Sequence, residues 1–446
     1  MSAPLATRLA AAVLHAAPPP GTAEAVALCL RDFLACALEA RDTAPSRAAR
    51  ALAQQEPGDA TLIGLAQRAL PGAAAFANAA AGHGLVREDM HAGSGSHLGI
   101  VVLPVLLALA QQRRVDGAAF AEAAAVGYEV GAQLGRHMVN PRFSRQWRPT
   151  GWTGPLAAVA AGARLLGLAP PQAASALNLA ANIVGGLNEW PRDGGDEMFL
   201  HPGFAARNAL AVLALAAAGA EGSAAALDGP AGLFAAAGAT PPAALPLFAE
   251  GDAELRHVFR KALPLCNFAQ TPAQAAQRLR HQAGAIDPDD IAAIRIRASE
   301  AAVRYPGCDG TGPFQRVLQA KMSIRFCVAA ALLHGAVEER HFALPADPAL
   351  LRLVALASLE IDPEATAAFP SRQGAEVSLT LRDGRQLTAA LPDLEPADAA
   401  RVQQRFAAAA QARLGAGGAA RLVAAFAEPA ALEDVGAALR LAEPAA

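Results

Sequence analysis

The chain has 446 residues, of which 53% are hydrophobic and 17% are charged, and its formal net charge is −3. This composition excludes an intrinsically disordered chain, and the charge gives no reason to expect nucleic acid or a membrane surface as a partner. The length allows two to four domains. We find no apolar run of about 20 uninterrupted residues and no signal-peptide pattern. The five cysteines form no C-x-x-C pair, so we expect a cytoplasmic protein without disulfides or a zinc knuckle.

Residues 1–260 are predicted to be a succession of helices. Segments rich in Ala and Leu alternate with Gly and Pro breaks, which is typical of helices joined by turns. Several of these segments are apolar around most of their circumference, so we expect them to be buried in a large helical core or at a subunit interface. The predicted helices cover residues 22–40, 72–84, 99–112, 117–137, 154–167, 170–186, 203–219 and 222–237.

The pattern changes after about residue 270. Residues 293–298 alternate between apolar and polar side chains, which predicts a strand, and 356–361 is a further strand candidate. Residues 376–391 predict a hairpin that turns at Asp383-Gly384. The tail, 396–440, is helical again. The fold prediction is therefore a mainly α protein with a large all-helical domain, residues 1–268 plus 400–446, and an inserted smaller α+β domain, residues 269–399.

A polar loop between two predicted helices, residues 82–99, is the first candidate site. It holds His83, His91 and His97 together with Glu88 and Asp89, and its glycines let side chains converge. Histidine titrates near neutrality and suits proton transfer. Their spacing matches no common zinc pattern, so we expect no metal. The competing interpretation is that these are polar loop residues that cap helices.

Other polar segments add candidates for substrate binding. Arg148 offers a fork of donors that suits a carboxylate, and Thr150 follows it just before the predicted helix 154–167. His201 ends a dense polar loop. Only two of the 37 basic residues are lysine, Lys261 and Lys321, and arginine does not replace the compact ammonium group of lysine.

Taken together in order and spacing, these segments resemble the MmgE/PrpD family, which includes 2-methylcitrate dehydratase, cis-aconitate decarboxylase and iminodisuccinate epimerase. The resemblance implies a homodimer whose subunits have a helical domain and a smaller lid domain, with the active site between them. It spans nearly the whole chain and rests on residues 78–83 with Glu88-Asp89, 97–99, Thr150 with the following helix, 200–206, 261–266 and 320–326.

The chain also departs from the pattern of the family. Val86 stands at the first acidic position and Arg148 at a histidine, while Met198, Gln270 and Phe326 stand where decarboxylase-like members carry lysine, histidine and tyrosine. Met198 does not neutralise a carboxylate, and neither Gln270 nor Phe326 titrates. We therefore do not expect genuine 2-methylcitrate dehydration or cis-aconitate decarboxylation.

The sequence thus predicts a divergent lyase or isomerase that acts on a small, carboxylated metabolite by proton transfer without a cofactor. Two alternatives stay open: an enzyme of specialised metabolism, performing cyclisation or elimination in a more apolar pocket, and a non-catalytic binding or scaffold relative. The predicted catalytic residues are His97, His91 and Asp89, and the predicted substrate-binding residues are His83, Arg148, Thr150, His201, Lys261, Gln270 and Lys321.

Overall fold

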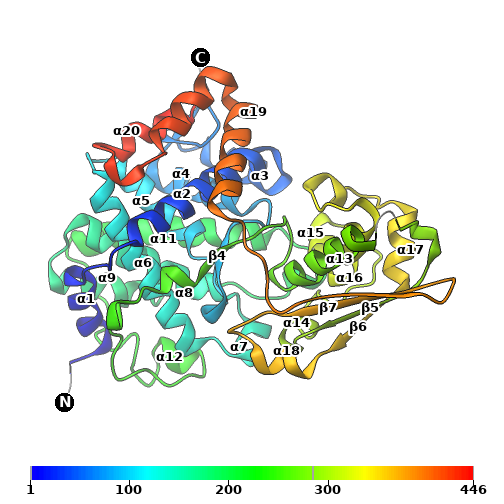
Figure 1. Cartoon of the computed structure of the whole chain (residues 1–446). Coiled ribbons are helices and arrows are strands. Elements are labelled where there is room, and N and C mark those ends of the chain that lie inside the picture. The colour runs from blue at the N-terminus through cyan, green and yellow to red at the C-terminus, as the bar shows by residue number, and fades with distance from the viewer. Residues whose placement is uncertain (1–2, 284–285, 445–446) are drawn as a thin grey trace.

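The computed structural model describes residues 3–283 and 286–444 and is mainly helical, as predicted. Figure 1 shows a large helical region beside a smaller region that contains a sheet. Each region has its own cluster of buried apolar side chains: the larger cluster comes from residues 5–258 and 406–442, and the second comes mostly from 262–391. The two regions thus bury separate cores.

The larger region is built from helices with a few two- and three-residue strands. Its helices are α1 (Leu5–His15), α2 (Thr22–Glu39), α3 (Ala44–Ala53), α4 (Pro71–His83), α5 (Gly99–Ala110), α6 (Gly117–Met138), α7 (Pro141–Gln146), α8 (Pro149–Leu166), α9 (Pro170–Ala180), α10 (Trp190–Asp193), α11 (Glu197–Ala217), α12 (Leu233–Ala236), α19 (Ala399–Ala425) and α20 (Val435–Leu439). Its strands are β1 (Ala60–Thr61), β2 (Arg68–Ala69), β3 (Asp89–His91) and β4 (Val258–Arg260).

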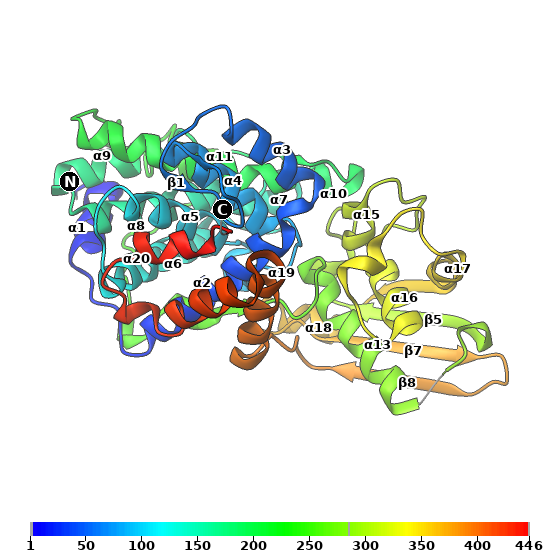
Figure 2. The same cartoon turned by 90° about the horizontal axis from the view of Figure 1, so that it is seen from above.

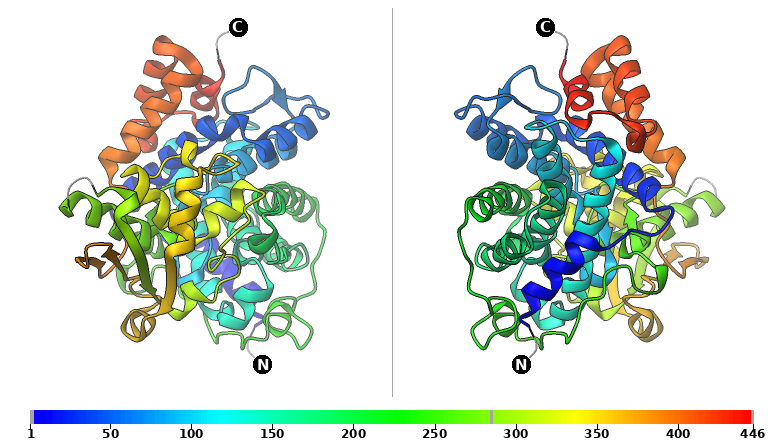
Figure 3. Two further views of the ribbon diagram at one scale, coloured as in Figure 1. Left: turned by 90° about the vertical axis from the view of Figure 1, so that its right-hand side faces the viewer. Right: turned by 90° about the vertical axis from the view of Figure 1, so that its left-hand side faces the viewer.

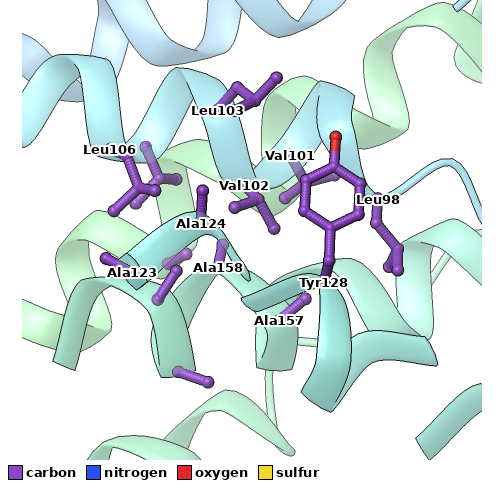
Figure 4. Close-up of a cluster of buried hydrophobic side chains, with 14 of the residues drawn as sticks. Leu98, Val101, Val102, Leu103, Leu106, Ala123, Ala124, Tyr128, Ala157 and Ala158 are labelled. Carbon is purple, nitrogen blue, oxygen red and sulfur yellow. The ribbon is translucent and has the colours of Figure 1, made fainter. Parts of the chain in front are cut away.

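Small residues let the central helices α6 and α8 approach closely. A Cβ atom added to Gly127 of α6 would lie 2.8 Å from the Cβ of Ala161 and 2.9 Å from the carbonyl oxygen of Ala157, both on α8. Figure 4 shows the alanines of α6 and α8 meeting the larger side chains of α5, including Val102 and Leu106. The Ala-rich composition therefore allows tight helix packing, because short side chains bring backbones together.

One predicted helix, residues 222–237, is wrong. Only α12 is helical there, and the rest forms turns. Asp228 accepts a hydrogen bond from the backbone N–H of Leu5 at 2.9 Å, and Gly229, Pro230 and Gly232 follow it. The alanines of this segment favour a helix, but glycine and proline outweigh them.

The smaller region consists of a four-stranded sheet and the helices that pack on it. The strands are β5 (Ile291–Ala298), β6 (Ala357–Ile361), β7 (Ala375–Leu381) and β8 (Gln386–Leu391), and the helices are α13 (Gln270–Ala283), α14 (Glu300–Val303), α15 (Val317–Met322), α16 (Ile324–His334), α17 (Pro348–Leu356) and α18 (Pro363–Ala368). The strand order is β6-β5-β7-β8, with β5 and β6 parallel and the other pairs antiparallel. Figure 2 shows α13 and α16 lying along one face of the sheet.

The predicted strands and the hairpin are present. Alternate residues of β7 are buried, as expected for a strand with one covered face, and β7 and β8 form the hairpin at Asp383-Gly384. After β8 the chain returns to the helical region, where α19 packs on α2. Figure 3 shows this return, in orange and red, above the helices of the N-terminal half.

The helix α11 is long and apolar enough to cross a membrane by length and composition. However, 56% of its apolar window is buried inside the protein, as in a core helix. Its hydrophobicity is thus explained by packing against α4 and α8.

Candidate active site

A cavity of about 550 Å³ lies where the two regions meet. Its wall on the helical side includes His83, His97, Arg148 and Lys261. The opposite wall comes from the smaller region and includes Cys266, Phe268, Tyr305 and Phe369. Such a concave site, lined by both apolar and polar side chains, is typical of small-molecule binding.

Glu88 lies behind the polar wall and contacts three of the residues that form it. Its Oε1 atom lies 2.9 Å from the Nδ1 atoms of both His83 and His97 and 3.2 Å from Nζ of Lys261. Burial alone would raise the pKa of Glu88, but His83, Lys261 and His97 together hold this pKa well below its ordinary value. Glu88 is therefore a carboxylate that its neighbours keep charged.

The pairing of two short strands brings Lys261 to Glu88. Asp89 of β3 pairs with Arg260 of β4 in antiparallel register, so the residue before Asp89 lies across from the residue after Arg260. Lys261 completes its contacts by donating to the carbonyl oxygen of Val86 at 2.7 Å. Val86 has φ of 58°, which is strained for a β-branched residue.

His97 is held so that one ring nitrogen faces the cavity. Its Nδ1 donates to the carbonyl oxygen of Asp89 at 2.9 Å, and because that oxygen only accepts, Nδ1 carries the proton. Among the described residues Nε2 has no hydrogen-bond partner. The backbone N–H of His97 donates to Oγ1 of Thr150 at 3.0 Å. Burial, and then the charge of Lys261, lower the pKa of His97 to about 4, so the ring is neutral at pH 7 with an unprotonated Nε2.

Arg148 is a buried cation at the cavity without a carboxylate partner among the described residues. Its Nη2 lies 2.8 Å from Nε2 of His83 and 3.8 Å from the sulfur of Met198, and its guanidinium lies 4.8 Å from the ring centre of Trp190. Burial lowers the pKa of Arg148, and burial also lowers the pKa of His83 to about 3. A neutral His83 can accept from Arg148, which leaves the positive charge available to an anionic ligand.

Two of the predicted catalytic residues do not reach this cavity. Tyr128 donates to the carboxyl group of Asp89, and burial raises the pKa of Asp89 to about 6. Nδ1 of His91 accepts from the backbone N–H of Ser94 at 3.1 Å, and Nε2 lies 2.9 Å from Glu254. Side chains alternate along β3, so Asp89 and His91 point away from the face that presents Glu88 and Met90.

Four predicted binding residues stand behind the wall instead of lining it. Thr150 positions His97, and Gln270 stabilises the turn at 263–265 through hydrogen bonds with the backbone of Leu263 and Leu265. Nζ of Lys321 donates to the carbonyl oxygen of Leu85 at 2.9 Å and pairs with Glu339 at 2.6 Å.

His201 is the fourth of these residues. Burial, and to a smaller extent the charge of Arg148, lowers its pKa to about 4.

Two of the departures from the family pattern also lie away from the cavity. Phe326 stacks on Phe342 in the core of the smaller region, and among the described residues Gln270 hydrogen-bonds only to the backbone groups given above. Met198 does line the cavity, so this departure changes the site directly.

The sequence did not identify two important parts of the site. Glu88 was recognised as one of the loop acids, but its place between two histidines and a lysine depends on the β3–β4 pairing. Tyr305 lines the cavity, accepts from Asn188 at 3.1 Å and has a pKa that burial raises to about 12. Its rarity was the available signal, since the chain has only two tyrosines.

Comparison with known proteins places this architecture in a family. Residues 5–245 match the MmgE/PrpD N-terminal domain, and residues 263–424 match the MmgE/PrpD C-terminal domain. The chain is 35% identical over 191 residues to "Cis-aconitate decarboxylase-like protein oryM" of Aspergillus oryzae, which covers 41% of this chain and 39% of that protein. It is 32% identical over 162 residues to "Cis-aconitate decarboxylase" of Aspergillus terreus, covering 35% of this chain and 33% of that protein. The chain thus matches only about a third of the length of these relatives, but the two domain matches together cover most of its own residues, and it belongs to the MmgE/PrpD family.

Proposed function

We propose that the chain is a lyase that moves a proton on a small carboxylated substrate, with His97 as the base and Arg148 as the carboxylate anchor. The observation that carries the proposal is that both groups line the same cavity. Arg148 is buried without an acidic partner among the described residues, and His97 presents an unprotonated Nε2 to the same space. A cavity with one anion anchor and one neutral base meets the minimum for proton abstraction beside a carboxylate.

The residues suggest how the step would run. Arg148 donates two parallel hydrogen bonds to a substrate carboxylate, which fixes the neighbouring carbon. Nε2 of His97 takes the proton from that carbon, and the imidazolium that forms is stabilised by Glu88, 2.9 Å from Nδ1. The positive charge of Arg148 stabilises the negative charge that develops on the substrate. His97 then returns the proton to the leaving group or to the product.

The charge of the cavity favours a substrate with one or two carboxylates. Arg145 and Arg148 line it without an acidic partner among the described residues, whereas Arg304 pairs with Glu300 at 2.8 Å and Lys261 pairs with Glu88. The two named relatives act on cis-aconitate or are similar to proteins that do. Because Met198 offers no charge to a third carboxylate, we propose that this chain takes a less acidic substrate than cis-aconitate or 2-methylcitrate.

A second candidate function follows from the opposite wall. Phe268 and Phe369 form an aromatic pair with ring centres 5.9 Å apart, and both line the cavity, as does Trp190. This wall suits a substrate with an apolar part, as an enzyme of specialised metabolism would use. We further propose that the smaller region closes over the cavity as a lid and that the protein works as a homodimer in the cytoplasm without a cofactor.

The proposal is tested by following carbon-bound hydrogen in D₂O by NMR. The protein is incubated with cis-aconitate, 2-methylcitrate and a panel of mono- and dicarboxylates, some with apolar substituents. We expect deuterium exchange or product formation with at least one mono- or dicarboxylate, reduced by about 10² or more in His97→Gln.

His137→Gln is the matched control, because His137 is exposed on α6, and it should keep wild-type rates. Equal rates in His97→Gln and the wild type would place the base elsewhere. Binding of carboxylates without exchange or turnover would support a non-catalytic relative and overturn the proposal.

A further inference from the structure

Two cysteines that are 42 positions apart in sequence meet in the wall of the cavity. Sγ of Cys266 lies 3.9 Å from Sγ of Cys308, and of the five cysteines, all within the described residues, only Cys266 lines the cavity. We propose that Cys266 is a reactive thiolate and a modification site for peroxides and other small soft electrophiles, with Cys308 as its resolving thiol. This proposal does not depend on the lyase function.

The backbone around Cys266 favours a thiolate. Cys266 immediately precedes a short 3-10 helix, residues 267–269, which runs directly into α13. The N–H groups of Phe268 and Ala269 at this helix start act with the nearby charge of Lys261 to lower the pKa of Cys266. A thiol at a helix N-terminus beside a cation is the common environment of reactive cysteines.

The two thiols are not equivalent. The hydrogen bond from Cys308 is the largest influence that lowers the pKa of Cys266, and burial opposes it. In contrast, burial raises the pKa of Cys308 well above its ordinary value. Cys308 therefore keeps its proton and donates it toward Cys266, which gives one nucleophile and one neighbour able to resolve it.

The backbone holds the two cysteines near each other. The N–H of Cys266 donates to the carbonyl oxygen of Lys321 at 3.0 Å, and the carbonyl oxygen of Cys308 accepts from the N–H of Ile324 at 3.0 Å. Both cysteines are thus tied to the junction of α15 and α16. The sulfurs need to approach by about 1.9 Å to reach the length of a disulfide bond, about 2.05 Å.

The chemistry with peroxide balances in two steps. The Cys266 thiolate attacks one peroxide oxygen, an S–O bond forms as the O–O bond breaks, and the released hydroxide takes up a proton to become water. The sulfur of Cys308 then attacks Cys266, the S–O bond breaks, and the departing hydroxide combines with the proton of Cys308 as a second water. The two sulfurs are oxidised to a disulfide, and the peroxide supplies the oxidant.

The remaining cysteines lack these features and serve as internal references. Burial raises the pKa values of Cys327 and Cys36 well above the ordinary value of a thiol. Sγ of Cys327 donates weakly to backbone carbonyl oxygens at 3.6 and 3.7 Å, in the core of the smaller region. Burial also raises the pKa of Cys29 well above its ordinary value, and we expect these three cysteines to be inert in the folded protein.

The test is site-resolved labelling of the full-length protein with limiting iodoacetamide at pH 7, followed by peptide mass spectrometry. Cys266 should be alkylated at least about 10 times faster than each of the other four cysteines. One equivalent of hydrogen peroxide should produce a Cys266–Cys308 disulfide. Cys308→Ser should stop the oxidation at a sulfenic acid on Cys266, trapped with dimedone, whereas Cys327→Ser should behave as the wild type.

Uniform labelling of all five cysteines, or slower labelling of Cys266 than of any other, would overturn the proposal in the wild-type protein, whether or not the variants fold. Fast labelling of Cys266 without a disulfide to Cys308 after peroxide would overturn the role of Cys308. Labelling needs no substrate, so failure here leaves the lyase proposal standing, and failure of the lyase proposal leaves this one standing.

Discussion

Two buried polar networks start from adjacent residues and face opposite directions. Glu88 joins His83, His97 and Lys261 at the wall of the cavity. The second network faces the helical region: Asp89 contacts Tyr128, and His91 contacts Ser94 and Glu254. Both are rich in titratable groups, and all of these residues except the partly exposed Glu254 are buried.

The difference shows that the direction in which a side chain points, more than its burial or residue type, separates a candidate catalytic group from a structural one. Along β3 the side chains alternate: Met90 lines the cavity, as do the three neighbours of Glu88, whereas Asp89 and His91 lie on the other face. The carboxyl groups differ accordingly: His83, Lys261 and His97 hold the pKa of Glu88 well below its ordinary value, whereas burial raises the pKa of Asp89 to about 6. The comparison predicts that similar substitutions in the two networks will affect stability and turnover differently.

The largest effect is expected from Glu88→Gln. This change leaves Lys261 buried without its carboxylate, and breaking a buried ion pair from one side costs about 3–5 kcal/mol. Urea denaturation at pH 7 measures the loss in the free energy of unfolding. Asp89→Asn is the matched control and should cost clearly less, since an amide still accepts from Tyr128. Equal losses in the two variants would break the distinction between the networks.

The pH dependence of stability sharpens the same contrast. The folded pKa of Asp89, about 6, lies above its ordinary value of 3.8, so the folded protein binds more protons than the unfolded chain between these values. The stability from Asp89 is therefore fully present below pH 3.8 and is lost as the pH rises through 6. Relative to the wild type, Asp89→Asn should gain about 2 kcal/mol between pH 4 and pH 7. A constant difference between the two proteins across this range would contradict the raised pKa.

Arg148→Gln should mainly weaken substrate binding. Because Arg148 is proposed to anchor a carboxylate in the ground state and the transition state alike, KM should rise by about 10–100-fold with a smaller change in kcat. Steady-state kinetics on a substrate found in the D₂O screen provide the measurement. A fall in kcat at unchanged KM would assign Arg148 to the chemical step.

The smallest effect is expected from Tyr128→Phe, which removes one hydrogen bond from the network that faces away from the cavity. The free energy of unfolding should fall by about 1–2 kcal/mol, because the buried Asp89 carboxyl group loses its donor. Turnover should stay within a few-fold of the wild type. A loss of turnover near 100-fold would show that the Asp89 network takes part in catalysis.

The sequence predicted the elements better than it predicted the site. Alternation of apolar and polar residues identified the hairpin at Asp383-Gly384. The Ala- and Leu-rich segments with Gly and Pro breaks predicted the ends of α4, α5 and α6 to within two residues. These features depend on local sequence, as does the polar loop with His83 and His97. The error at 222–237 arose because alanine content was weighed above its glycines and proline.

What the sequence did not predict depends on contacts between distant segments. The central role of Glu88 follows from the register of β3 with β4, which are separated by more than 160 positions. The meeting of Cys266 with Cys308 follows from hydrogen bonds to the junction of α15 and α16. Gln270 and Lys321 are polar residues in motif-like segments, yet they stabilise backbone turns. Residue type alone does not distinguish these roles.

The central claim is that His97 presents an unprotonated Nε2 to the cavity while Nδ1 donates to Asp89. ¹⁵N NMR of histidine-labelled protein tests it most directly, with His97→Gln used to assign the signals. We predict a neutral ring from pH 5.5 to 8, protonated on Nδ1 and unprotonated on Nε2, since the pKa of His97 is lowered to about 4. A ring protonated on Nε2, or a doubly protonated ring at pH 7, would contradict the account.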